Sequence, residues 1–243
     1  MNRYMKKEFL LFAAALFLLC SCSPGSLSGS EQTITRGIKT SAGKIVIKGN
    51  VDVEINDESN VMTITGDSNL LKLVKVKDGK KVITVTATAG LLRDAASPRV
   101  KVTLPFIPML NYLKMEGTSY FKFGRGDIGP KLTIETKGAN HVYSVMAMVD
   151  LVIKAEGSDF IEVDCVCDTA DIDAKGSCVI GTEKGPIAAD NLKIFTFGTS
   201  VAYVEAGREA FGAAEEASTI YTRGEHYYGK LKAKDKGRII PYE

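Results

Sequence analysis

Along the second half of the chain, apolar and polar residues alternate in short runs that recur about every twenty positions. Each recurrence contains one alternating arm, a glycine and a second alternating arm. The glycines Gly117, Gly138, Gly157, Gly176 and Gly198 follow one another at intervals of 21, 19, 19 and 22 residues. Alternation with a period of two buries one face of each arm, so each arm is predicted to be a β-strand. One pair of such strands cannot bury its apolar face alone, and the repeats are therefore expected to stack.

The glycines are expected at the corners between arms, because glycine adopts positive φ without strain. Ala217 lies 19 residues after Gly198 and is interpreted as the next corner. Small polar side chains at a bend can bond to the backbone or to each other. Such residues occupy the second position after most corners: Ser119, Asn140, Asp159, Cys178, Ser200 and Thr219.

These patterns predict an all-β protein, a β-solenoid with about 20 residues per coil that spans residues 37–243. Strands before Gly117 follow a looser pattern, so the first half is expected to be less regular. A subdivision near residues 105–110 is predicted, because Pro105 and Pro108 interrupt the alternation there. No convincing helix is expected.

The first 21 residues are typical of an export signal. Arg3, Lys6 and Lys7 precede an apolar run of 11 residues at 9–19, which is too short to cross a bilayer, since a helix needs about 20 residues for that. Cys22 follows the small Ser21 and fits a lipoprotein processing site, with cleavage as a plain secretory signal as the alternative. Residues 22–36 are then the lipidated cysteine and a flexible tether.

The charge balance argues against a nucleic-acid partner. The chain has 31 basic and 29 acidic residues; three of these bases and one of these acids lie in residues 1–21, which leaves 28 of each sign. A neutral chain has little electrostatic attraction for nucleic acid. Contact with the membrane is expected through the lipid anchor. No acidic cluster follows Cys22, so an outer-membrane lipoprotein that faces the periplasm is favoured over surface exposure.

The order of segments resembles a known family. It runs from "IVIKGNVDVEINDE" and "VMTITGDSNLL" through "VKVTLP" and "LKMEGTSYF" to the recurring G-[TAS]-[SNDC]-x-[VI] and "ASTIYTRG". Over about residues 33–243 the sequence resembles the putative auto-transporter adhesin family with the head GIN domain, whose function is unknown. The resemblance implies a right-handed, single-stranded parallel β-helix in the cell envelope. It brings no catalytic or binding residues.

Three cysteines beyond the signal are predicted to be buried free thiols. Cys165, Cys167 and Cys178 are 2, 11 and 13 residues apart, whereas a disulfide between stacked coils needs a separation of about one repeat. Two cysteines at i and i+2 of one strand make a poor disulfide, since their Cα atoms are about 6.5–7 Å apart. No fourth ligand for zinc lies nearby, so neither a metal nor another cofactor is expected.

Asp171 and Asp173 flank an inward Ile172 and could place two carboxylates on one outer face, as in polysaccharide-degrading enzymes. A solvated strand face is the simpler interpretation. His141 and His226 lie 85 residues apart, and no nucleophile motif accompanies either. No catalytic residues are therefore assigned.

Aromatic residues recur at positions expected to face outward. Tyr120, His141 and Phe160 stand three residues after their glycines, in a series that continues through Val179 and Val201 to Ile220. Tyr143 and Tyr203 stand five residues after theirs. Cover by loops or by the C-terminal tail is one interpretation of these residues, and a binding strip is the other.

We therefore predict a membrane-tethered envelope lipoprotein whose β-helix binds or adheres to a polysaccharide or an envelope protein, without enzymatic activity. The alternatives are a polysaccharide lyase or hydrolase on a β-helix scaffold, and a purely structural component of the envelope.

Overall fold

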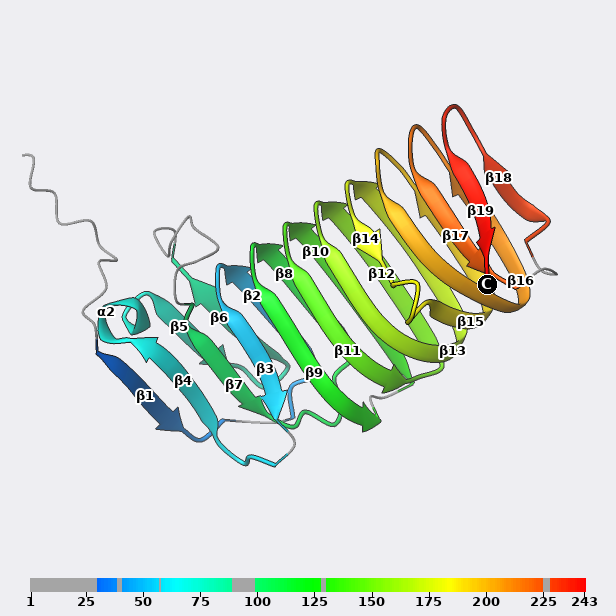
Figure 1. Cartoon of the computed structure of the whole chain (residues 1–243). Helices are drawn as coiled ribbons and strands as arrows, with labels where there is room; N and C mark the ends of the chain where they lie inside the picture. Colours follow the sequence, from blue (N-terminus) through cyan, green and yellow to red (C-terminus); the bar gives the residue numbers. More distant parts are fainter. Residues whose placement is uncertain (1–29, 39–40, 57, 89–98, 128–129, 225–227) are drawn as a thin grey trace, which may run out of the picture.

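The computed structural model describes residues 30–38, 41–56, 58–88, 99–127, 130–224 and 228–243. Over these ranges the chain forms an elongated β-solenoid of about six turns with a repeat of roughly 19 residues (Figure 1). The predicted fold class and the less regular first half are confirmed. Cys22 and the predicted export signal lie outside the described residues.

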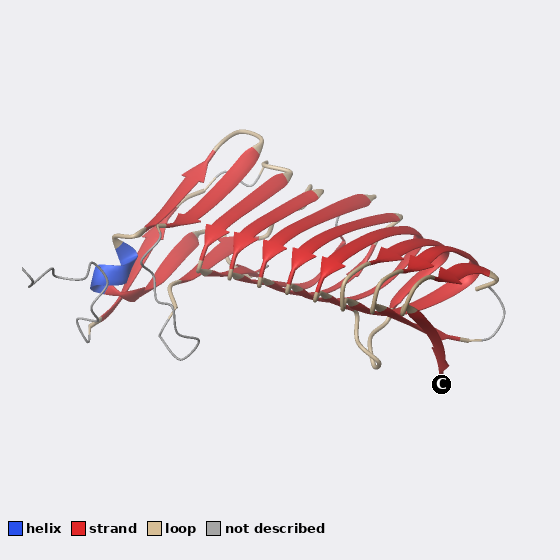
Figure 2. Cartoon of the chain, turned by 90° about the horizontal axis from the view of Figure 1, so that it is seen from above, coloured by secondary structure: helices blue, strands red, loops and turns tan. Residues whose placement is uncertain are grey.

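Each coil contributes one strand to each of two walls, which meet at the corner glycines. Wall A holds the strands that lead into the corners, and wall B holds the strands that leave them. Wall A contains β6 (Val82–Ala87), β2 (Lys44–Gly49), β8 (Tyr112–Gly117), β10 (Lys131–Gly138), β12 (Asp150–Gly157), the second half of β13 (Phe160–Gly176), β15 (Ile187–Thr196), the second half of β16 (Val201–Ala214) and β18 (Lys230–Ala233). Wall B contains β7 (Lys101–Pro105), β3 (Asp52–Asn56), β9 (Tyr120–Asp127), β11 (His141–Ala147), the first half of β13, β14 (Val179–Ile180), the first half of β16, β17 (Thr219–Arg223) and β19 (Arg238–Tyr242). Figure 2 shows these strands from above.

Within each wall the strands of successive coils run parallel and pair in register, apart from shifts between Ser144 and Met146 and between Ala189 and Asn191. In wall A, Gly138 pairs with Gly117 on one side and with Gly157 on the other. Ile153 pairs with Ile134 and Ile172, and all three are fully buried between the walls. Stacks of like residues fill the core because equivalent positions of successive coils lie about 4.8 Å apart.

The N-terminal region departs from simple winding. The β6–β7 coil and the β8–β9 coil stack on opposite sides of the β2–β3 coil, so the chain builds an inner coil first and returns to both of its edges. Beyond the β6–β7 coil, on the side away from the β2–β3 coil, β4 (Met62–Asp67) runs antiparallel to β7, and β5 (Val74–Asp78) runs antiparallel to β6. β1 (Glu31–Arg36) is antiparallel to β4, and the one-turn helix α2 (Ser68–Leu71) follows β4.

In the central coils, two features of the corners require glycine: the backbone φ and the lack of space for a Cβ atom. Gly138 and Gly157 have φ values of 134° and 122°, which L side chains rarely adopt. A Cβ atom on Gly138 would lie 2.1 Å from the carbonyl oxygen of Gly117, and one on Gly157 would lie 2.3 Å from that of Gly138. Each corner thus packs directly on the backbone of the corner below it.

The predicted corner at Ala217 is wrong by one residue. Thr219 pairs with Val201, so Glu216 is the residue equivalent to Gly198, and its φ is 61°. Ser218 rather than Thr219 takes the second position, and Ile220, expected to face outward, is fully buried. Non-glycine residues can enter the left-handed α region as single residues, and the later corner at Asp235, with φ of 55°, does so too.

Candidate functional site

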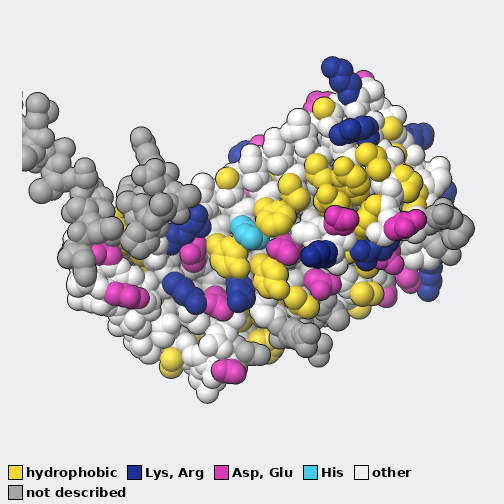
Figure 3. Space-filling model, in the orientation of Figure 1, with side chains coloured by type: hydrophobic (Ala, Val, Ile, Leu, Met, Phe, Trp, Pro, Cys, Tyr) yellow, Lys and Arg dark blue, Asp and Glu magenta, His cyan; other side chains and the backbone are white. Residues whose placement is uncertain are grey.

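Three residues of the predicted strip lie side by side on wall B. Tyr120, His141 and Phe160 pair in register on three successive coils, with their side chains facing outward. The ring centroids of Tyr120 and His141 are 5.0 Å apart, and those of His141 and Phe160 are 4.7 Å apart. Figure 3 looks onto this wall, where hydrophobic side chains gather around the imidazole. All three side chains are half-buried.

Tyr143 lies in the adjacent outward row, between Lys122 and Glu162. Tyr203 belongs to a separate group, because the coil of β14 lies between Phe160 and β16. The structure therefore divides the predicted strip into two parts. Tyr120, His141, Tyr143 and Phe160 form the first aromatic group.

The second aromatic group contains two tyrosines that the sequence prediction missed. The ring of Tyr203 stacks on that of Tyr221 with centroids 4.8 Å apart and an interplanar angle of 8°. Tyr242 stands nearly perpendicular to both rings, at 89° and 86°. The Arg223 guanidinium lies 5.4 Å from the centroid of the Tyr242 ring and donates a hydrogen bond of 2.8 Å to the carbonyl of Glu183 in the β14–β15 loop. With the corner placed correctly at Glu216, Tyr221 would have been predicted as an outward residue.

His141 is the titratable centre of the first aromatic group. Burial lowers the pKa of its imidazole below the usual value, and the nearby Glu162 opposes that shift. The His141 Nε2 atom lies 3.8 Å from Glu162 Oε2, which is too long for a hydrogen bond, and it has no other hydrogen-bond partner among the residues that the structure describes. The neutral imidazole therefore presents an aromatic rather than a cationic surface near pH 7.

The outward face of wall A has a different chemistry, in which charges alternate in sign from coil to coil. The residues that precede the corner glycines form a ladder in register: Lys48, Glu116, Lys137, Glu156 and Lys175. Lys48 and Glu116 approach to 3.0 Å, and Lys137 and Glu156 to 2.9 Å. A shallow depression of about 320 Å³ lies between this ladder and the next outward row.

Asp171 and Asp173, the candidate enzymatic carboxylates, also lie on wall A. Asp171 Oδ2 is 2.9 Å from Lys193 Nζ, and Asp173 Oδ2 is 3.1 Å from Lys175 Nζ. Both carboxylates thus take part in the ion pairs of this wall. This arrangement corresponds to the solvated strand face rather than to a pair of carboxylates poised for catalysis.

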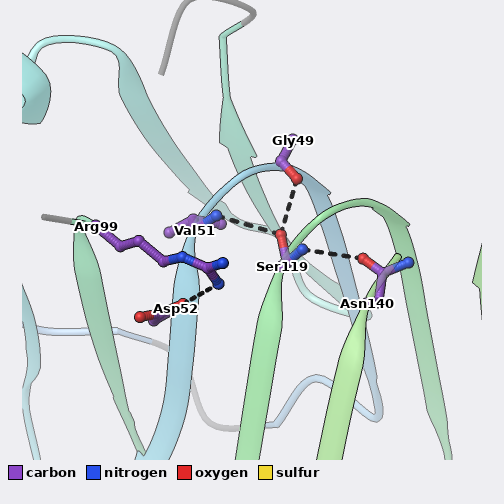
Figure 4. Close-up of polar contacts among 6 residues, drawn as sticks. All are labelled: Gly49, Val51, Asp52, Arg99, Ser119 and Asn140. Carbon is purple, nitrogen blue, oxygen red and sulfur yellow. Dashed lines mark hydrogen bonds and ion pairs between the residues drawn. The ribbon is translucent and has the colours of Figure 1, made fainter. Parts of the chain in front are cut away.

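Buried polar side chains tie successive corners together inside the solenoid. The Ser119 hydroxyl donates to the Gly49 carbonyl at 3.0 Å and accepts from the Val51 N–H at 3.3 Å, while the Ser119 N–H donates to Asn140 Oδ1 at 3.1 Å (Figure 4). The Asn140 N–H in turn donates to Asp159 Oδ1 at 2.7 Å. These side chains satisfy backbone groups at the bends, so their role is structural.

The three cysteines are free and buried, as predicted. The neighbouring Cys167 thiol and burial raise the pKa of Cys165 above its usual range, and the neighbouring Cys165 thiol lowers the pKa of Cys167. Burial raises the pKa of Cys178. Among the described residues, no three His, Cys, Asp or Glu side chains lie close enough together to hold a metal ion.

Within the same described ranges, no helix is long and apolar enough to cross a membrane.

The fold and wall B define the class of protein: a β-solenoid with an extended lateral face that carries outward aromatic groups. The chain belongs to the family described as putative auto-transporter adhesin, head GIN domain, which matches residues 43–225. No curated protein matches the chain.

Solved structures share the fold at low sequence identity. A putative adhesin from Bacteroides fragilis NCTC 9343 superimposes with a TM-score of 0.70 at 16% identity, over 88% of this chain and 98% of that chain. A protein described as a putative lipid binding protein from Parabacteroides distasonis ATCC 8503 gives a TM-score of 0.58 at 15% identity, over 88% and 95% of the two chains. A putative adhesin from Parabacteroides merdae ATCC 43184 gives 0.55 at 17% identity, over 89% and 98%. At these identities the likeness shows the fold alone.

Proposed function

We propose that the protein is a membrane-tethered adhesion module of the cell envelope, and that wall B binds its partner. The observation that carries this proposal is the accumulation of outward rings in two groups along one wall, while the other wall carries mainly alternating charges and a single ring pair, Phe195 and Phe211. Outward side chains contribute little to the core of a solenoid, so an aromatic face needs a reason outside folding. Membership of the adhesin family supports the same function.

The ring geometry favours a protein partner over a polysaccharide. Tyr203 and Tyr221 stack on each other, so the ring faces between them are occupied and hydroxyls and edges remain for contact. Sugar recognition by stacking would need free ring faces. Tyrosine and arginine are the residue types enriched among the strongest contributors to protein interfaces. The second aromatic group contains both residue types, since Arg223 lies beside Tyr242.

A pair of matched double variants tests the binding face. Tyr143→Ala with Phe160→Ala removes rings from wall B, whereas Phe195→Ala with Phe211→Ala removes a pair of outward rings, with centroids 5.8 Å apart, from wall A. Immobilised protein is exposed separately to envelope proteins and to envelope polysaccharides. We expect wild type and the wall A variant to retain the same protein, and the wall B variant to retain at least tenfold less.

Equal retention by both variants would remove wall B as the binding face. If the wild type retained only polysaccharide and the wall B variant lost that retention, wall B would remain the binding face. The partner would then be a polysaccharide rather than a protein. Blank results in both fractions would leave a purely structural role as the better account.

The proposed anchor is tested independently. Cys22→Ser should release the protein into the soluble fraction or leave it unprocessed, because acyl chains would supply most of the membrane affinity. If the substituted protein stays with membranes, a face of the folded protein makes that contact. The protein is still expected to be an outer-membrane lipoprotein that faces the periplasm.

A further inference from the structure

The first strand of the described chain leaves one side of its backbone without a neighbouring strand. Among the described residues, β1 pairs with β4 alone, and all six of its residues are exposed. It lies at the N-terminal end of the sheet, beyond β7 and β4 (Figure 1). β1 is therefore an edge strand, and the N–H and C=O groups on its outer side can pair with an added strand.

The bonds between β1 and β4 show which backbone groups face the free side. The Ser68 N–H donates to the Ser30 carbonyl at 3.1 Å, in the same register as the β1–β4 pairs. In an antiparallel ladder, the backbone groups of successive residues point to alternate sides of the strand. The even-numbered residues of β1 therefore bond to β4, and Thr33 and Thr35 present their backbone groups to the free side.

The opposite end of the solenoid is protected against strand addition, whereas β1 is not. The terminal strands β18 and β19 carry the exposed Lys230, Lys232 and Pro241. Lysine and proline are devices by which natural edge strands avoid pairing. β1 has neither residue type, and it pairs with β4 without a shift from Glu31 to Arg36. The N-terminal edge is thus better suited to strand addition than the C-terminal one.

An isoleucine on β1 offers an apolar contact at the same edge. Ile34 pairs with Ile64 of β4, which is 8% exposed and belongs to the core. Directly paired residues of an antiparallel ladder share a face, so Ile34 lies on the core side of the sheet. The core ends here, however, and Ile34 is 48% exposed. A strand added beside β1 would cover this side chain.

We propose that β1 pairs antiparallel with β1 of a second copy of this chain, with Ile34 opposite the partner's Ile34. A two-fold axis normal to the sheet relates the two copies, and such an isologous contact closes as a dimer. Thr33 then bonds to the partner's Thr35 through the free backbone groups. The two isoleucines form a non-hydrogen-bonded pair, in which opposite side chains come closest.

The sequence of β1 is complementary to itself in this orientation. The strand begins with Glu31 and ends with Arg36, so antiparallel pairing keeps like charges apart and brings the acidic start of one strand near the basic end of the other. The Arg36 guanidinium also donates a hydrogen bond of 2.8 Å to the Val76 carbonyl of β5 and lies 3.6 Å from Asp78. These contacts hold β1 in place, so each copy presents its edge already formed.

The proposed pairing would join two solenoids through wall B. The strands β3, β7, β4 and β1 follow one another in this sheet, so the two copies would share one continuous sheet. A two-fold axis normal to the sheet keeps both outward faces on the same side. The aromatic groups of both copies could then engage one partner surface together, which raises the avidity of a weak contact. This consequence rests on the proposed function, whereas the pairing of β1 does not.

Cysteine crosslinking in intact cells that express the full chain tests the pairing. Ile34→Cys is expressed in two differently tagged forms, and so are the controls Thr33→Cys on the same strand and Lys232→Cys on β18. After mild oxidation, proteins are separated without reductant, and wild type measures the background from the native cysteines. Residues in a directly opposed pair are close enough for a disulfide, whereas the two Thr33 positions are diagonal and too far apart. We expect roughly tenfold more doubly tagged dimer from Ile34→Cys than from either control.

A matched pair of second substitutions tests whether the backbone of β1 makes the contact. Thr35→Pro removes an N–H group on the free side, and Thr35→Ala keeps it. Added to Ile34→Cys, the proline should lower the dimer yield roughly tenfold and the alanine should leave it unchanged. The proposal would be overturned by no dimer from Ile34→Cys, by equal yields from the three cysteine positions, or by a dimer that survives Thr35→Pro. A product that links Ile34→Cys to a different protein would also overturn it.

Discussion

Walls A and B share the same coils, yet different side chains dominate their outward faces. On wall A, Lys48, Glu116 and Lys137 continue an alternating ladder in which neighbouring charges neutralise each other. On wall B, the equivalent surface carries aromatic rings that pack against one another. The inward residues are mostly apolar on both walls, with a few buried hydroxyl side chains such as those of Thr136 and Ser144, because both walls face the same core. The comparison teaches that the repeat fixes the core and the corners, while the outward positions are free to carry function.

The largest effect is expected where the two walls join. Gly157→Val should cost on the order of 4 kcal/mol, because it adds strain at positive φ to a clash with the Gly138 backbone. Chemical denaturation measures the change. The matched control is Glu216→Gly at a corner that already tolerates a side chain, and it should change stability by less than about 1 kcal/mol. Comparable losses at both corners would show that the glycine stack has no special role.

The inward faces of the two walls should respond alike. Ile153→Ala in wall A and Ile161→Ala in wall B each remove a fully buried side chain and should cost about 2–5 kcal/mol. Hydrogen exchange should show the loss of protection first in adjacent coils, since coils contact only their neighbours. If one wall tolerated the change freely, the core would not be shared equally between them.

Reversing one charge on wall A tests the ladder. Lys137→Glu would place like charges next to Glu116 and Glu156 and should cost about 1 kcal/mol or less at low salt, because exposed pairs contribute little. The cost should shrink as salt is added. Thermal denaturation at two salt concentrations measures both. A cost that is independent of salt would indicate a packing effect instead.

The ladder should also weaken in acid. Hydrogen bonds from Lys114 and Lys48 lower the pKa of Glu116. A carboxyl group with a lowered folded-state pKa contributes stability above its unfolded pKa, and that contribution disappears as pH falls through the folded value. The pH dependence of unfolding in Glu116→Gln should therefore be flatter than that of wild type in the acidic range. Identical curves would show that Glu116 adds nothing.

The smallest change in stability is expected on the outward face of wall B. Tyr143→Ala removes a half-exposed ring and should alter the free energy of unfolding by less than about 1 kcal/mol. Its effect should appear in partner binding instead. A loss of several kcal/mol would make this ring part of the fold and weaken its assignment to a binding surface.

The periodic glycines were enough to predict the solenoid, because positive φ and stacked corners leave no alternative residue at Gly138 or Gly157. Glu216 escaped prediction because a single residue in the left-handed region need not be glycine. That error of one position reversed the expected facing of Ile220 and hid Tyr221. An alternating pattern also cannot distinguish parallel from antiparallel strands, so the antiparallel pairs of β4 and β5 were unforeseen.

The charged face of wall A could have been foreseen, since its ladder stands one residue before the glycines from Lys48 to Lys175. Tyr242 could not, because it joins the second aromatic group only through the pairing of β19 with β17. Which strands become neighbours near the C-terminus depends on where each corner falls. The repeat alone does not determine the corners there, because they are not glycines.

Site-specific photocrosslinking in intact cells tests the central claim, that wall B rather than wall A is the binding face. A photoreactive residue replaces Tyr143 on wall B in one protein and Phe211 on wall A in another. The account predicts a discrete crosslinked protein product from the Tyr143 position and none from the Phe211 position. The same product from both positions, or a product from Phe211 alone, would contradict it.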